Sequence, residues 1–527
     1  MNSLVRKYKY EIMICIILII GFFVRIYGIS EHPNGLNVDE ASIGYEAYSI
    51  MNYGIDRNGK TYPVFLEAWG SGQNALYAYL IMPFIKVFGL STFSVRFPIA
   101  IVGCISLIVL YKLLKIIENK KMTLCVLFIF SISPWYIMKS RFGLESNILP
   151  DIILWSVYFF SKFLKYDKKE NFYIGSAFLG IASYAYGISY FVIPVFFIMF
   201  IALLLKKKRI KLLEAFIGLG IIFVIALPII LMIFINSFNL NEIKIGFITI
   251  PRMQSNRYET LTLLSKGSIL KTMISNFSES MKILLTGDDK LLSNAIFPYG
   301  IIYRFSIPLT IIGLFLSFKR KNEINIMMNI WFLTSILLTF IVEPNINRIN
   351  VLWIPVIYYT AIGVYEIIEN VKVLGYILVV MYLIAFISFE NTYFKTDFTN
   401  NYTFYDGIES VIKYTNEIEA EEIYFEYAFK EPYIYVLFYN KINPRYFNAT
   451  VKYKNNIKSF DSVKSFGKYI FSLPKKLDNT KDVAYILKKK EEKNYNIDED
   501  LWKKTYIDDF LVLEKKIKED LHWKNYF

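Results

Sequence analysis

The sequence predicts a polytopic α-helical membrane protein of about eleven transmembrane helices, followed by a small C-terminal α/β domain outside the membrane. The 527 residues are 55% hydrophobic and 18% aromatic, and the mean hydropathy is +0.38. This composition is too apolar for soluble domains. Runs such as "AFIGLGIIFVIALPIILMIF" are long enough to cross about 30 Å of hydrocarbon as helices. Residues 391–527 are polar by contrast, which separates a tail domain from the membrane part.

The predicted spans follow from the hydropathy pattern. They cover residues 11–29, 93–117, 122–138, 147–164, 172–187, 190–205, 212–235, 300–318, 324–342, 350–368 and 373–389. Basic clusters mark every second connection, at residues 6–9, 112–121, 165–169, 206–211 and 319–321. By the positive-inside rule these connections are cytoplasmic. The protein is therefore expected to be a multi-pass cell-membrane protein with a cytoplasmic N-terminus and an extracytoplasmic C-terminal domain.

The formal net charge of +14 has the same explanation, because the Lys and Arg residues lie mainly beside apolar runs and in the tail. A nucleic-acid groove would need a different distribution, so no nucleic-acid partner is expected. The first apolar run is a membrane anchor and not a cleaved signal, since no small-residue cleavage site follows it. The three cysteines, Cys15, Cys104 and Cys125, all fall in predicted spans and encode no disulfide framework.

Residues 1–390 are predicted to form the transmembrane domain and residues 391–527 the tail domain. Two outer loops, 30–92 and 236–299, are long for simple connections, and loops of that length are usually functional. The stretch 74–89 contains Pro83 and is short, so an interfacial helix is preferred over a twelfth span. In the tail, "EEIYFEYAF", "DVAYILKK" and "DDFLVLEKK" resemble strands, while Ile408, Val411, Ile412 and Ile418 form a helical stripe.

The acidic pair Asp39 and Glu40 stands out in the first outer loop. After it, Ile43, Ala47, Ile50 and Met51 share one helix face, and Gly54 is a natural stop. Asp39 falls where a helix N-cap is expected, and a cap alone would explain it. Its adjacent carboxylate, Glu67 and the Gly-rich "WGSGQN" favour a functional role for the loop.

A second charged cluster lies between the third and fourth predicted spans, in "SPWYIMKSRFGLESNILPD". Ionisable groups at membrane depth cost a few kcal/mol each unless they face a polar cavity. Such a cavity is expected here, although snorkelling of Lys139 and Arg141 to the interface would also explain two of the groups. The four residues of the cluster are Lys139, Arg141, Glu145 and Asp151.

Two further arginines, Arg96 and Arg348, precede predicted spans on the outer side. Outer arginines run against the positive-inside bias, so an anionic partner is expected, either a lipid headgroup or a carrier phosphate. Carboxylates above a basic pocket at the membrane surface suit group transfer from a lipid phosphate. A base removes the acceptor proton while cations stabilise the departing phosphate.

The chain resembles the GT-C glycosyltransferases, in the branch with the protein O-mannosyltransferases and the lipid A aminoarabinose transferases. The resemblance rests on Pro33 with Asp39 and Glu40, then "GIDRNGKTYPVF", "YAYLIMPFIKVFGLSTFSVRFPIAIVG", "SRFGLESN" and "NINRINVLWIPVIYYTAIG". It covers the transmembrane domain, 1–390, which it marks as the catalytic domain. The tail matches only as the variable outer domain that such enzymes often carry.

The resemblance implies that Asp39 is the catalytic carboxylate with Glu40 beside it, that Arg96 is the family arginine, and that Glu145 is a second acid. It also implies a donor sugar linked to undecaprenyl or dolichyl phosphate. We therefore assign Asp39, Glu40 and Glu145 to catalysis, and Arg96, Arg141 and Arg348 to the donor phosphate. Relatives often carry Lys-Pro-Pro or His-Pro-Pro where this chain has "GSGQNALY". With His32 as the only histidine of the loop, the residues specify no metal site and no cofactor, and leave a divalent metal open.

The sequence thus predicts a membrane glycosyltransferase that moves a sugar from a polyprenyl phosphate carrier to an acceptor on the outer face. The sugar, a hexose or a pentose, and the acceptor, a protein, a lipid or a glycan, stay open. The alternative from another class is a lipid-linked precursor flippase or transporter, which would keep its polar site near the bilayer midplane between repeated halves. A surface protein with a binding tail is a third reading, but a single anchor would suffice for it.

Overall fold

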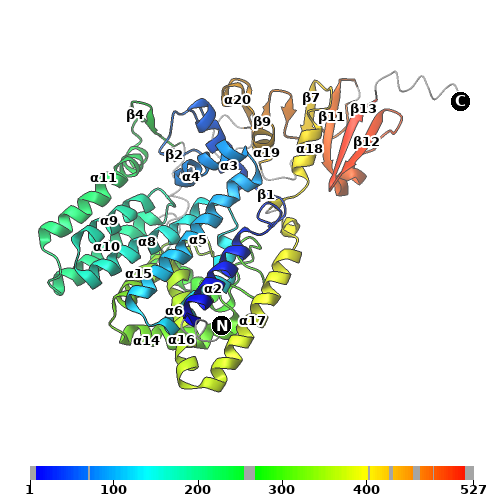
Figure 1. Cartoon of the computed structure of the whole chain (residues 1–527). Coiled ribbons are helices and arrows are strands. Elements are labelled where there is room, and N and C mark those ends of the chain that lie inside the picture. Colours follow the sequence, from blue (N-terminus) through cyan, green and yellow to red (C-terminus); the bar gives the residue numbers. More distant parts are fainter. Residues whose placement is uncertain are drawn as a thin grey trace.

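In the computed structural model, a bundle of long helices carries a mixed β-sheet at one end (Figure 1). The structure describes residues 8–68, 72–253, 268–401, 404–426, 431–454, 463–478 and 480–516. The N-terminal end of α2 lies at the end of the bundle away from the sheet (Figure 1). The protein is therefore mostly helical and membrane-embedded, as the sequence predicts.

Helices cover most of the residues of each predicted span. In chain order they are α2 (Lys9–Ile26), α5 (Thr92–Ile117), α6 (Lys120–Ile132), α7 (Pro134–Lys139), α8 (Glu145–Tyr166), α9 (Lys169–Ala182), α10 (Ser189–Lys206), α11 (Leu212–Ser237), α14 (Ile307–Lys319), α15 (Glu323–Thr339), α16 (Trp353–Asn370) and α17 (Lys372–Lys395). Within the described residues, 5 helical segments are long and apolar enough to cross a membrane: Thr92–Ile117, Ser189–Lys206, Leu212–Ser237, Asn350–Asn370 and Lys372–Lys395. The count of eleven spans stays a prediction, as does the boundary at residue 391, which falls within α17.

Ion pairs between helix ends gather at the end of the bundle away from the sheet. Lys120 Nζ lies 2.7 Å from Glu11 Oε1, and Lys121 Nζ lies 2.9 Å from Glu369 Oε1. These lysines belong to the basic cluster 112–121, which the positive-inside rule assigns to the cytoplasm. The orientation of the chain in the membrane stays a prediction.

Helices α14 and α16 pack with their backbones in contact. A Cβ atom on Gly313 would overlap the carbonyl oxygen of Tyr359, and a Cβ atom on Gly363 would overlap that of Leu309. Small residues are the usual means of such close packing in membranes, where van der Waals contact replaces the hydrophobic effect as the driving force.

Replacing Gly313 by Ala is therefore expected to destabilise the bundle by about 1–3 kcal/mol, because α14 and α16 must separate. Thermal unfolding of the purified protein in detergent should give a lower Tm. Gly220→Ala is the matched control, since Gly220 is also within a long helix but a Cβ there meets nothing within 4 Å. Equal Tm values for the two variants would contradict this packing.

The first outer loop forms helices α3 (Val38–Tyr53) and α4 (Leu76–Phe88) and the hairpin of β2 (Phe65–Leu66) and β3 (Gln73–Asn74). Gly54 ends α3 in the left-handed conformation at φ 72°, as the sequence predicts. The 13 residues of α4 fall short of the hydrocarbon thickness at about 1.5 Å per residue, but α6 and α14 have 13 residues as well, so the interfacial position of α4 stays a prediction. The helix packs against α3 and α5, which suits an interfacial position. Residues 69–71 of "WGSGQN" lie outside the described residues.

The tail contains a seven-stranded mixed sheet of order β12-β13-β11-β7-β10-β9-β8. Its strands are β7 (Glu422–Phe425), β8 (Lys452–Tyr453), β9 (Val463–Phe466), β10 (Tyr469–Ile470), β11 (Val483–Lys488), β12 (Trp502–Ile507) and β13 (Phe510–Lys515). Strand β7 runs parallel to β10 and β11, and the other pairs are antiparallel. The domain's helices are α18 (Ile408–Tyr414), α19 (Pro432–Tyr439) and α20 (Pro444–Thr450).

The tail domain docks on the first outer loop. Strand β6 (Phe404–Tyr405) pairs with β1 (Leu36–Asn37), immediately before α3. Helix α19 packs on α3, where the Tyr45 hydroxyl donates to the Ile442 carbonyl at 2.8 Å. The start of α3 is therefore held between the bundle and the tail domain.

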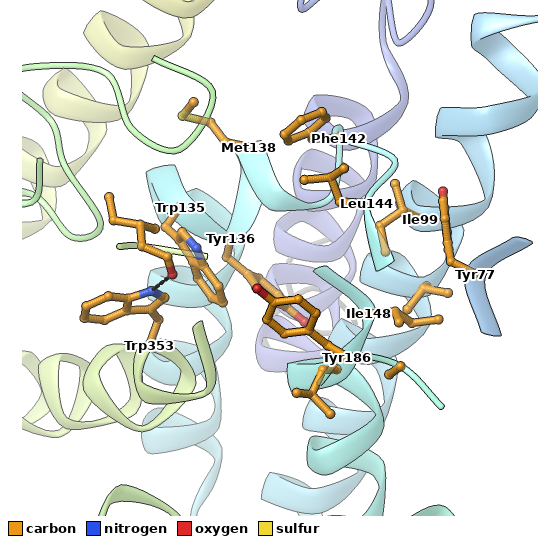
Figure 2. Close-up of a cluster of buried hydrophobic side chains, with 14 of the residues drawn as sticks. Tyr77, Ile99, Trp135, Tyr136, Met138, Phe142, Leu144, Ile148, Tyr186 and Trp353 are labelled. Carbon is orange, nitrogen blue, oxygen red and sulfur yellow. Dashed lines mark hydrogen bonds between the residues drawn. The ribbon is translucent and has the colours of Figure 1, made fainter. Parts of the chain in front are cut away.

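Large aromatic residues pack together inside the bundle (Figure 2). Trp135, Tyr136 and Trp353 are each at most 1% exposed. The Trp353 indole donates to the Ile346 carbonyl at 2.9 Å, so its polar atom is satisfied inside the core (Figure 2). This packing lies at the start of α16, which Arg348 precedes, and near the start of α8, which carries the predicted site residue Glu145.

Candidate functional site

The acidic pair lies in the first turn of α3. Asn37 is the N-cap of this helix, because its side-chain Oδ1 accepts the backbone N–H of Asp39 at 2.8 Å. The prediction that Asp39 caps the helix is therefore wrong. The sequence pattern that identifies Asn37 as the N-cap is a capping box: Glu40 follows Asn37 by three residues and accepts its backbone N–H at 3.2 Å.

The Glu40 carboxylate is 0% exposed and takes part in four hydrogen bonds. Its Oε1 accepts from Arg96 Nε at 2.8 Å and from the Gly143 backbone N–H at 2.9 Å. Its Oε2 accepts from Arg96 at 2.7 Å and from Asn37. The carboxylate thus ties together the first loop, helix α5 and the turn before α8, and has no lone pair left for a substrate.

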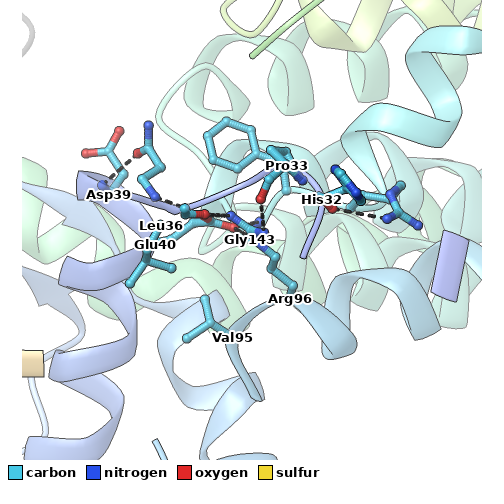
Figure 3. Close-up of polar contacts among 12 residues, drawn as sticks. His32, Pro33, Leu36, Asp39, Glu40, Val95, Arg96 and Gly143 are labelled. Atoms are coloured by element: carbon cyan, nitrogen blue, oxygen red, sulfur yellow. Dashed lines mark hydrogen bonds and ion pairs between the residues drawn. The ribbon is translucent and has the colours of Figure 1, made fainter. Parts of the chain in front are cut away.

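Arg96 holds the other side of this buried pair. A guanidinium has five N–H donors, and here two bond to Glu40 while three bond to backbone carbonyls. The carbonyls belong to Ile29, Pro33 and Gly35, at 3.4, 2.7 and 2.7 Å (Figure 3). With 0% exposure and every donor engaged, Arg96 orders the chain that leads into α3 and offers nothing to a phosphate.

The Asp39 side chain differs from that of Glu40 in its direction and in its burial. Adjacent positions on a helix point in directions about 100° apart, and Figure 3 shows the Asp39 carboxylate turned away from the Glu40–Arg96 pair. Its side chain is half-buried, whereas that of Glu40 is buried. The tail domain lies close to it: burial raises the pKa of Tyr435 in α19, and the negative charge of Asp39 adds to this shift.

Arg141 is also 0% exposed and fully engaged. Its Nε donates to the Tyr393 hydroxyl at 3.1 Å. Its remaining donors reach carbonyls at and beyond the end of α2, where a helix has no internal donors to offer: Val24, Tyr27, Gly28 and His32, at 2.7–3.2 Å. Arg141 therefore caps the first helix and its following turn, and at 0% exposure it does not snorkel to the interface.

Lys139 and Asp151 pair with each other inside the bundle. They are 3% and 0% exposed, and the Tyr136 hydroxyl donates to the second Asp151 oxygen at 2.8 Å. The two charges neutralise each other, which lowers the cost of burying them, and the polar cavity around this cluster stays a prediction.

Glu145 begins α8 and is 6% exposed. Its Oε2 accepts from Gln73 Nε2 at 2.8 Å. This contact joins α8 to strand β3 of the first loop, and Gly143 joins the same turn to Glu40. Glu145 thus lies in the chain segment that is bound to the acidic pair.

Arg348 lies before α16, in a turn anchored by the contact of Asp289 with the Ile346 N–H at 2.9 Å. Its side chain is 29% exposed. Its guanidinium contacts Glu343, at 3.4 Å to the carbonyl and 3.6 Å to the carboxylate. Among the three arginines that the sequence singles out, it alone combines exposure with guanidinium N–H groups that bond to none of the residues that the structure describes.

Sequence reasoning missed a second buried ion pair in the first loop. Arg57 Nε lies 3.0 Å from Glu46 Oε1, and the Arg57 backbone N–H donates to Oε2 at 2.9 Å. Burial raises the pKa of Glu46 to about 8, and the charge of Arg57 opposes this shift. The residues are 11 apart across a helix end, so no local spacing reveals the pair. In the described residues, no three His, Cys, Asp or Glu side chains form a metal-binding group.

The family model described as "Dolichyl-phosphate-mannose-protein mannosyltransferase" matches residues 74–232. No curated protein matches the sequence. Among solved structures, ArnT from Cupriavidus metallidurans bound to undecaprenyl phosphate is similar with a TM-score of 0.59 at 9% identity, over 96% of this chain and 98% of that one. Its apo state gives a TM-score of 0.58 at 10% identity, with the same coverage.

The oligosaccharyltransferase of Archaeoglobus fulgidus, in complex with Zn and sulfate, is similar with a TM-score of 0.52 at 13% identity. The match covers 81% of this chain and 61% of that longer one. At these sequence identities the structural matches show a similar fold and nothing more, whereas the family match is a match of sequence. Together they show that the chain has a fold similar to that of ArnT, and that residues 74–232 match the model of the dolichyl-phosphate-mannose-protein mannosyltransferases.

Proposed function

We propose that this protein transfers a sugar from a polyprenyl phosphate carrier to an acceptor on the outer face of the membrane, with Asp39 as the general base. The observation that carries the proposal is the difference in burial and hydrogen bonding between the two residues of the acidic pair. Glu40 is buried with all its lone pairs engaged, whereas Asp39 beside it is half-buried and turned away. The bound undecaprenyl phosphate of ArnT supports a lipid-linked donor.

The chemistry follows from these roles. Asp39 accepts the proton of an acceptor hydroxyl as its oxygen attacks the anomeric carbon of the sugar. The bond between that carbon and the phosphate oxygen breaks, and the polyprenyl phosphate leaves with the electron pair. A cation near the departing oxygen stabilises the developing charge. The acceptor is a protein, lipid or glycan with a nucleophilic hydroxyl.

In this proposal Arg96 and Arg141 are positioning residues, because their N–H groups bond to the protein. Arg348 is the arginine that we assign to the donor phosphate, and Glu145 is assigned to the sugar. The acidic pair and Arg96 lie where the tail domain docks on the bundle. This location suits transfer at a membrane surface and gives no support to a transporter.

The test is mass spectrometry of carrier lipids and surface glycans in a strain that lacks this protein. We expect a polyprenyl phosphate sugar to accumulate and a surface sugar to disappear, and the wild-type chain should restore both. The purified protein in nanodiscs should then release polyprenyl phosphate from that donor. Unchanged carrier lipids and glycans, with no release in vitro, would remove the transferase proposal.

Replacing Arg348 by Ala is expected to raise the KM for the donor about ten-fold or more, because a charge-assisted contact to phosphate is lost. The kcat should change less than KM. Arg304→Ala serves as the control: Arg304 is exposed, and its guanidinium donates to the Thr286 carbonyl at 3.0 Å. Equal KM values for wild type and Arg348→Ala would exclude Arg348 from the phosphate site.

A further inference from the structure

Three buried carboxamide side chains surround the turn that leads into α8. Gln73 Nε2 donates to Glu145 Oε2 at 2.8 Å, and Asn147 Nδ2 donates to the Phe142 carbonyl at 2.9 Å. The third is Asn350 of the 3-10 helix η3 (Asn350–Leu352), whose Nδ2 donates to the Ser146 carbonyl at 2.6 Å. They come from three separate elements, β3, α8 and η3, and are 3%, 1% and 0% exposed.

The oxygen of each carboxamide has no hydrogen-bond partner among the described residues. Exchanging oxygen and nitrogen would not help, because each NH₂ group faces a carbonyl or a carboxylate, which only accepts. A buried acceptor without a donor costs about 1–3 kcal/mol. Three such oxygens around one turn are unusual for a packed core, in which buried polar groups are almost always paired.

The missing partner must supply several donors to these acceptors. A sugar ring does so, since its hydroxyl groups each carry one O–H donor at fixed positions. The turn is also next to the acidic pair, because the Gly143 N–H donates to Glu40 Oε1 at 2.9 Å. A sugar bound at this turn would therefore lie near Glu40, which directly follows the proposed general base Asp39 in α3.

From this arrangement we infer that Gln73, Asn147 and Asn350 form a subsite that recognises free hydroxyl groups of the transferred sugar. The inference rests on the proposed function and adds the residues that select the sugar. An acceptor-only subsite favours sugars with unmodified hydroxyls, because an acylated or deoxy position has no donor to offer. The three oxygens are closed to solvent, so sugar binding requires a local rearrangement of the turn or of β3.

The experiment compares a donor with its single-deoxy analogues. Short-chain neryl phosphate sugars, hexoses and pentoses, are offered to the full-length protein in nanodiscs, and kcat/KM is measured for each. For the wild-type protein we expect the kcat/KM of at least one deoxy analogue to be about ten-fold or more below that of its parent donor, because a buried acceptor then stays unpaired. In Asn350→Leu or Gln73→Leu, the kcat/KM of the same analogue should be within about three-fold of the kcat/KM of its parent donor. This is the result that a double-mutant cycle gives when the missing hydroxyl and the replaced carboxamide contact each other.

Asn325→Leu is the matched control, since Asn325 is 0% exposed but lies at the start of α15, beside Asn322. It should keep the wild-type discrimination. If Asn350→Leu does not fold, Asn350→Ser replaces it. Discrimination that stays unchanged in both Gln73 and Asn350 variants would overturn the subsite and leave these oxygens a structural or water-binding role. A wild-type protein that consumes no lipid phosphate sugar would instead refute the proposed function.

Discussion

Replacing Asp39 by Asn is expected to lower kcat about 100- to 10,000-fold while the protein stays folded. General base catalysis contributes an effect of this size, and the amide cannot accept the acceptor proton. The fold should tolerate the change, because Asp39 is half-buried and the helix is capped by Asn37 and Glu40 through contacts that the substitution leaves intact. The measurement is single-turnover transfer from the donor identified in the deletion strain.

Two controls separate chemistry from structure in this experiment. Thermal unfolding should give the same Tm for Asp39→Asn and the wild type within about 2–4 °C. Asp406→Asn changes an exposed carboxylate that accepts from the Asn34 amide at 3.4 Å, also near the docking surface of the tail domain, and should keep near-normal kcat. A folded Asp39→Asn protein with wild-type turnover would remove Asp39 from the reaction.

The architecture was predictable because membrane helices carry a strong local signal. Each predicted span is a continuous apolar run, whereas the assignment of α4 to the interface, from its length and Pro83, stays a prediction. In the tail, β11 and β13 lie within the stretches whose residue types favour strands. The order of the seven strands was not predictable, because pairs such as β7 with β11 join residues about 60 apart in the chain.

The candidate site was predictable in location but not in roles. Asp39 and Glu40 are adjacent, so the sequence presents them as equals. Their difference depends on Arg96 and Gly143, which are 56 and 103 residues from Glu40. Such contacts have no local pattern. For the same reason Arg96 and Arg141 read as candidate phosphate ligands until their carbonyl partners are known.

The unpaired carboxamides illustrate a further limit. In the sequence, Gln73 belongs to "GSGQNALY", which departs from the basic pattern of the family that the chain resembles, and no local pattern marks Asn147 or Asn350. Asparagine is frequent throughout this chain, so a single one carries little information. What distinguishes these residues is burial of an acceptor without a donor, a property of the folded packing.

Replacing Arg96 by Ala is expected to destabilise the protein by about 3–5 kcal/mol, because Glu40 would be left as an uncompensated buried charge. The carbonyls of Ile29, Pro33 and Gly35 would lose their donors as well. Arg96→Lys should rescue little, since an ammonium has three donors and cannot form the fork that bonds both Glu40 oxygens. Thermal unfolding without any donor lipid is the measurement.

This experiment discriminates between the two roles of Arg96. A phosphate ligand would leave the Tm of the lipid-free protein unchanged and raise the KM for the donor, whereas a positioning residue lowers the Tm before any substrate is present. The double variant Arg96→Leu with Glu40→Leu should recover part of the stability that the single Arg96→Ala variant loses, because no charge remains buried alone. A Tm for Arg96→Ala equal to that of the control Arg304→Ala, with a raised KM, would restore Arg96 to the phosphate site and require another explanation for the burial of Glu40.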